Sequence, residues 1–117
     1  MGNEIVLISK EISLPELKAI AAKRFGDMVK GVVDLEKRVI ALGADLHADE
    51  EAFLLERGSK QENLWGINLY VDLAFPEMVE FDSMINIRPS QNNRSRSMED
   101  SAIREQILDL LKALISF

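Results

Sequence analysis

The chain of 117 residues contains no cysteine and a single histidine. The absence of cysteine excludes disulfides, cysteine-based zinc sites, iron–sulfur clusters and thiol nucleophiles. The longest apolar run near the start covers only the four residues from Ile5 to Ile8, and no basic segment precedes it. Such a run is too short to cross a bilayer or to form the core of a signal peptide. We therefore expect a cytoplasmic protein that does not associate with membranes.

Several catalytic and cofactor motifs are missing as well. The sequence has no glycine-rich phosphate loop, no serine nucleophile elbow and no pair of histidines. A nucleophile assisted by a histidine base would have to rely on His47 alone. We therefore expect neither a cofactor nor a resident metal ion.

Size and charge place the chain among ordinary globular proteins. A length of 117 residues predicts one domain with a core of its own, and 47% hydrophobic and 29% charged residues are typical of that class. The net charge of −6 argues against general affinity for nucleic acids, which requires a broad basic face.

Hydrophobic periodicity predicts three helices. The first begins at a capping box formed by Ser13 and Glu16. The second is about ten residues long, starts among acidic residues and ends before Gly58, although a strand leading into a turn is the alternative. The third is amphipathic and begins at a cap provided by Ser97 or Asp100.

Two short apolar runs, over residues 5–8 and 39–42, and alternating patterns over residues 29–35, 64–71 and 79–88 predict about five strands. The second and third form a hairpin around Glu36, with a helix through this segment as the alternative. The order β-α-β-β-α-β-β-α indicates an α+β fold, an antiparallel sheet with helices on one face.

An arginine-rich loop is the first candidate site. The window from Ser83 to Met98 contains three arginines and no acidic residue, so it carries +3 while the rest of the chain carries −9. Arg88, Arg94 and Arg96 are planar donors suited to carboxylates or phosphates, and Asn93 adds a neutral donor. The alternative is a solvated loop whose arginines pair with the protein's own acids.

A polar strand face is the second candidate. If Asn68 lies opposite Asp82 in an antiparallel pair, both share one surface with Tyr70, Asn86 and Arg88. These side chains would form a binding floor on rigid strands. The alternative is that this face is the solvent-exposed side of a sheet. The asparagines in both strands count against that alternative, because asparagine is depleted in strands.

An acidic segment around the histidine is the third candidate. His47 is followed by Asp49, Glu50 and Glu51 and preceded by Asp45. These residue types bind divalent cations or perform acid–base chemistry, but their spacing matches no metal motif. The alternative is an acidic helix start with His47 as a cap.

Three segments form distinctive motifs: residues 46–51 running on to Gly58 and Ser59, residues 64–70, and residues 85–89 running on to residues 93–95. Together they resemble a small bacterial family, frequent in cyanobacteria and of unknown function. The resemblance covers nearly the whole chain and implies a complete single-domain protein. It implies no activity, cofactor or catalytic residue.

These observations favour a binding or regulatory protein that receives an anionic ligand or an acidic protein segment at the arginine loop and the polar strand face. The first alternative is a metal-assisted hydrolase of a phosphate-bearing substrate that uses His47 and nearby carboxylates. The second is a structural oligomer subunit. The last helix also has the spacing of a two-helix seam, so a homodimer is an alternative to its packing on the sheet.

Overall fold

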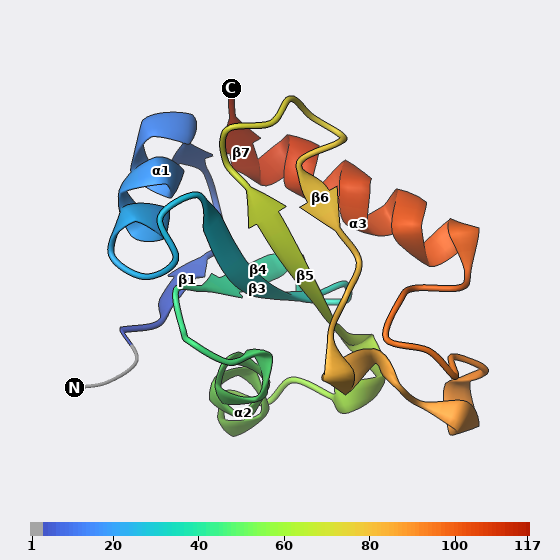
Figure 1. The fold of residues 1–117 in the computed structure, drawn as a ribbon. Coiled ribbons are helices and arrows are strands. Elements are labelled where there is room, and N and C mark those ends of the chain that lie inside the picture. The colour runs from blue at the N-terminus through green and yellow to red at the C-terminus, as the bar shows by residue number, and fades with distance from the viewer. Residues whose placement is uncertain (1–3) are drawn as a thin grey trace.

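An antiparallel five-stranded sheet with the strand order β1-β4-β3-β5-β6 lies at the centre of the computed structural model (Figure 1), which describes residues 4–117. Three α-helices and a separate parallel pair, β2 with β7, complete this part of the chain. The α+β prediction and the antiparallel sheet are confirmed. The elements are β1 (Val6–Ile8), β2 (Ile12–Ser13), α1 (Leu14–Ala22), β3 (Met28–Asp34), β4 (Val39–Leu42), α2 (His47–Glu56), β5 (Leu64–Tyr70), β6 (Val79–Glu80), α3 (Ser101–Leu114) and β7 (Ile115–Ser116), with 3-10 helices η1 (Gln61–Asn63), η2 (Met84–Asn86) and η3 (Pro89–Gln91).

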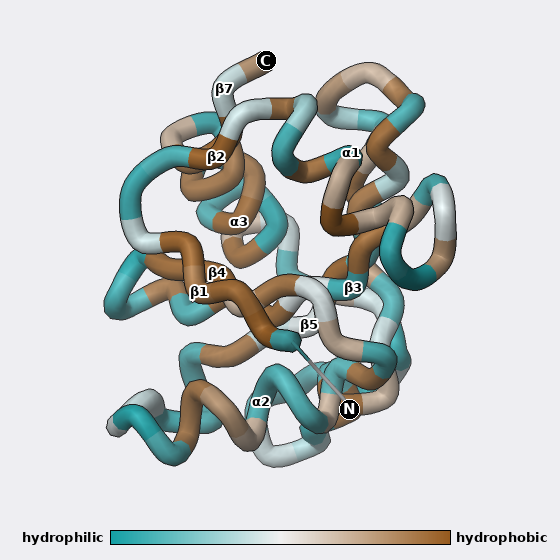
Figure 2. The backbone as a smooth tube through the Cα atoms, turned by 90° about the vertical axis from the view of Figure 1, so that its left-hand side faces the viewer, coloured by the Kyte–Doolittle hydropathy of each residue, from teal (hydrophilic) through white to brown (hydrophobic). Residues whose placement is uncertain are grey.

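The helices cover both faces of the sheet, so the prediction that they lie on one face is wrong. α1 and α3 share the main core with Val29 and Ile67, whereas α2 places Leu54 against Val32 and Leu64 on the other face. The physical reason is that β3 and β5 carry apolar residues on both sides, which must be covered. Figure 1 shows α2 below the sheet and the other two helices above it. In Figure 2 the edge strand β1 is hydrophobic, while much of α2 is hydrophilic.

The helix ends follow the predicted capping chemistry. The Ser13 hydroxyl accepts from the Glu16 amide, and the Glu16 carboxylate accepts from the Ser13 amide at 2.9 Å, which confirms the capping box. For α3 the cap is Asp100, whose carboxylate accepts from Ala102 N at 2.8 Å, and not Ser97. No helix among residues 4–117 is both long and apolar enough to cross a membrane.

The predicted β3–β4 hairpin is confirmed, and its turn is stabilised by an aspartate. Asp34 Oδ1 accepts from the amides of Glu36 and Lys37, at 2.9 and 3.0 Å. Arg38 adopts the left-handed conformation, with φ of 56°. The side chain of Asp34 thus replaces the Asn-Gly pair that tight hairpins usually use.

The predicted strand over residues 79–88 is wrong beyond Glu80, where β6 ends. The Asn86 side-chain amide then takes both peptide groups of Gly66: Gly66 N donates to Oδ1 at 2.8 Å and Nδ2 donates to Gly66 O at 3.0 Å. The side chain of Asn86 therefore bonds to β5 at the position where a further residue of β6 would have paired. The register also differs from the prediction, since Asn68 lies opposite Glu80 and not Asp82.

We predict that Gly66→Ala destabilises the fold by about 1–3 kcal/mol through overpacking. A Cβ at this position would lie 2.6 Å from Ser83 Cβ and 2.7 Å from Ser83 Oγ. The double variant Gly66→Ala/Ser83→Gly removes that contact and should recover part of the loss in urea denaturation. Equal loss in the single and double variants would contradict the packing explanation.

Candidate functional site

Arg88, expected on an exposed polar face, is a buried structural residue with 7% exposure. Its guanidinium donates to the carbonyls of Gln61 and Leu64, and Nε donates to Ile85 O at 3.1 Å. The group also stacks on the indole of Trp65, with Cζ 4.0 Å from the ring centroid. Arg88 therefore ties the segment after β6 to the start of β5.

Two of the three asparagines in the loop are also used inside the protein. Asn93 is 3% exposed, and its Nδ2 donates to the carbonyls of Asn86 and Ser97 at 2.7 Å each. Its Oδ1 accepts from Glu99 N at 2.9 Å. Asn86, which is fully buried, pairs with Gly66 as described. These amides form the internal framework of the arginine loop, which explains why Asn86 occurs between two isoleucines.

The remaining two arginines differ in their surroundings. Arg96 Nε donates to Asp82 Oδ1 at 2.7 Å in a partly exposed ion pair, and Arg96 Nη1 lies 3.6 Å from the Met84 sulfur. The Arg94 side chain is exposed and has no ion pair within residues 4–117. Pairing with the protein's own acids, the alternative reading of the loop, thus applies to Arg96.

Part of the polar strand face is organised by Glu80. Its Oε1 accepts from Asn68 Nδ2 at 2.8 Å and from the Tyr70 hydroxyl at 3.2 Å. Desolvation, followed by the charge of Glu80, raises the pKa of Tyr70. Asn68 also donates to the Asp82 carbonyl at 3.3 Å. The structure thus brings together three of the predicted site residues, namely Asn68, Tyr70 and Asp82. The side chains of Asn86 and Arg88 instead bond to backbone groups inside the protein.

A pocket of about 200 Å³ lies between the start of α2 and the segment that contains η2. It brings together one predicted residue of the arginine loop, the predicted histidine, and a lysine of β3 that sequence reasoning missed. The sequence feature that could have pointed to this lysine is its position two residues before Val32, which places both on the sheet face that α2 covers. The pocket is lined by Lys30, Leu46, His47, Ala48, Ser83, Met84, Ile85 and Arg96.

The positive character of this pocket has two sources. Lys30 is half-buried and has no ion pair within the described residues. The N-cap residue of α2 is Leu46, whose side chain has no hydrogen-bond acceptor, so no side-chain hydrogen bond caps this helix end. The N–H groups at the start of a helix have no intrahelical partner and carry the positive end of its dipole. Both sources favour an anion.

His47 is fixed in the pocket wall as a neutral ring. Its Nε2 lies 2.8 Å from Ile67 O, and since a carbonyl only accepts, Nε2 carries the proton and Nδ1 is an acceptor. Burial lowers the pKa of His47, and the charge of Lys30 lowers it further. The Asn68 side chain also interacts with this ring. The Oδ1 of Asn68 has no hydrogen-bond partner among the described residues.

Glu50, one of the predicted acidic companions of His47, is buried beside the pocket and not in it. Its Oε2 accepts from Ala44 N at 3.0 Å, whereas Oε1 has no partner within residues 4–117. Burial raises the pKa of Glu50 to about 9, so the carboxyl group is neutral at pH 7. Within the described residues, no group of three or more His, Cys, Asp or Glu side chains is arranged to hold a metal ion.

A family model described as "Protein of unknown function (DUF5674)" matches residues 6–114. The chain belongs to this family. The match confirms the predicted membership in a small family of unknown function, and DUF5674 carries no assigned activity that could be transferred to the pocket. No curated protein and no solved structure matches the chain.

We predict that Arg88→Met costs about 3 kcal/mol or more, because each buried carbonyl left without a donor costs about 1–3 kcal/mol. Arg88→Lys should also be destabilising, since one ammonium cannot replace a planar fork that reaches several acceptors. The matched control is Arg94→Met, which should change the free energy of unfolding by less than about 0.5 kcal/mol. Urea denaturation measures all three, and similar effects at both positions would refute the structural role of Arg88.

We predict that Glu50 makes stability fall as pH rises. Its pKa is raised from 4.5 to about 9, so between these values the unfolded chain has released a proton that the folded protein retains. The free energy of unfolding then decreases by up to about 1.4 kcal/mol per pH unit from this group.

The variant Glu50→Gln has no proton to lose and should lack this contribution. Its stability relative to the wild type should increase from pH 5 to pH 9 in urea denaturation. A constant difference across this range would contradict the buried neutral carboxyl.

Proposed function

We propose that this protein is a binding domain for a small organic carboxylate, which it holds in the pocket at the start of α2. One observation carries the proposal: Lys30, a half-buried cation without an ion-pair partner in the described residues, lines the same pocket as the uncapped N-terminus of α2. A cation beside the positive end of a helix dipole favours a bound anion.

The charge balance favours a single negative charge. Arg96 already shares its charge with Asp82, and His47 is neutral, which leaves Lys30 as the uncompensated cation of the lining. One carboxylate matches this balance better than a phosphate dianion, whose second charge would have no partner. The Arg96 guanidinium donates to Asp82 through Nε and contacts the Met84 sulfur through Nη1, which leaves Nη2 to orient the ligand.

The apolar part of the lining limits the rest of the ligand. Leu46, Ala48, Met84 and Ile85 surround the cavity together with the charged groups. A volume of about 200 Å³ is small for a ligand site. We infer a short aliphatic chain attached to the carboxylate. Of the three arginines in the loop, Arg96 lines this pocket, whereas Arg88 and Arg94 do not.

We predict that monocarboxylates of three to five carbons stabilise the protein in a thermal-shift assay, and that inorganic phosphate does not. A ligand at 100 times its Kd stabilises by about 2.7 kcal/mol, a shift of roughly 10 °C for a chain of this size. Lys30→Met should abolish the shift because it removes the uncompensated charge. Arg94→Met is the matched control, since Arg94 does not line the pocket.

Two outcomes would overturn the proposal. The first is that no monocarboxylate raises the melting temperature of the wild type. The upper limit of the concentration range is the point at which the same acid begins to destabilise the Lys30→Met protein. The second is an equal shift in the wild type and in Lys30→Met, which would show binding at another place.

A further inference from the structure

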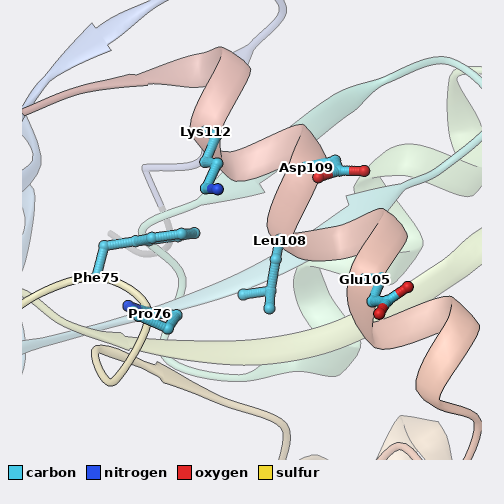
Figure 3. Close-up of a pocket in the computed structure, with 6 residues that line it drawn as sticks. All are labelled: Phe75, Pro76, Glu105, Leu108, Asp109 and Lys112. Atoms are coloured by element: carbon cyan, nitrogen blue, oxygen red, sulfur yellow. The ribbon is translucent and has the colours of Figure 1, made fainter.

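A larger groove lies on the other side of the molecule, between α3 and the connection from β5 to β6. Figure 3 shows Phe75 and Pro76 of this connection facing Leu108 of α3, with Glu105, Asp109 and Lys112 along the helix. The groove has a volume of about 440 Å³. Since α3 covers the sheet face opposite α2, the groove is separate from the pocket of Lys30.

The floor of the groove is apolar and extends beyond it. The rings of Phe75 and Phe117 lie 5.4 Å apart, and Phe117 is 61% exposed. Lys112 Nζ lies 5.9 Å from the centroid of the Phe75 ring, which places this cation at the aromatic end. An exposed aromatic side chain that continues an apolar groove in this way is characteristic of an interaction surface.

The other end of the groove is acidic and uncompensated. Glu105 and Asp109 are four residues apart on α3 and therefore project from the same side of the helix. Neither forms an ion pair within the described residues. Lys112, three residues after Asp109, forms no ion pair among these residues either and lies over the Phe75 ring. Arg104, next to Glu105, donates from Nε to Met98 O, and its guanidinium faces Phe81. Two carboxylates beside an apolar floor thus lack a basic partner.

We propose that this groove binds a basic, apolar segment of a partner protein. An aliphatic side chain of the partner lies between Phe75 and Leu108, and a lysine or arginine next to it pairs with Glu105 and Asp109. Charge complementarity favours this occupant over a second copy of the chain, because each copy carries a net charge of −6. The proposal is independent of the carboxylate pocket, which has the opposite charge preference and lies on the opposite face.

The test is an NMR titration of the ¹⁵N-labelled protein with an acetylated and amidated octapeptide of alternating leucine and lysine. The control peptide has glutamate in place of lysine. Amide shifts should follow the lysine peptide only and should concentrate on residues 73–77 and 105–112. The variant Glu105→Gln/Asp109→Asn keeps the shape of the groove and should weaken binding by at least about tenfold, because it removes two charge pairs. Glu56→Gln, an exposed acid on α2, is the matched control and should bind like the wild type.

Three results would overturn the proposal. Equal shifts with the glutamate peptide would remove the charge argument. Shifts spread over the surface, or unchanged in the double variant, would show nonspecific attraction to an acidic protein. A dimer in sedimentation equilibrium that Leu108→Gln dissociates would show that a second copy occupies the groove.

Discussion

The pairing of the Asn86 side-chain amide with the peptide of Gly66 is the interaction on which the rest of the site depends. It supplies the hydrogen bonds that another strand residue would otherwise give to β5, and so lets the chain leave the sheet after Glu80. The same amide donates to Arg96 O at 3.1 Å. One side chain therefore fixes both the segment from Ser83 to Ile85 and the backbone of Arg96, which together form one wall of the pocket. A buried amide can hold this arrangement because all of its groups are paired, and a partly paired one would be costly.

Much of the fold could be predicted from the sequence because it depends on local signals. The Ser13–Glu16 capping box, the alternation along β5 and the amphipathic pattern of α3 all act within a few residues. The segment after Glu80 could not be predicted, because its alternation of apolar residues is typical of a strand. What determines its structure is the long-range bonding of Asn86 and Arg88 to β5, which local periodicity does not encode.

The candidate site shows the same division. The sequence drew attention to His47 and Arg96, which the structure places in the lining of one pocket, because an isolated histidine and a basic loop in an acidic chain are visible without a structure. It did not reveal that Arg88 and Asn93 are bound by backbone groups, since a structural arginine and a ligand-binding one have the same side chain. It did not single out Lys30, which lines the pocket because α2 covers its face of the sheet. The two proposed surfaces lie on opposite faces of the sheet and favour opposite charges.

The parallel pair of β2 and β7 has a consequence for the order in which the molecule is made. Ile12 pairs with Ile115, so a contact near the beginning of the chain must wait for a residue more than a hundred positions later. Both isoleucines belong to the main core, together with the helices α1 and α3 that follow and precede them. During synthesis the sheet from β1 to β5 can form early, but this closure requires residues 115 and 116 to have left the ribosome. Before α3 is made, the sheet face that α1 and α3 share is only partly covered, which exposes apolar surface in the newly made chain.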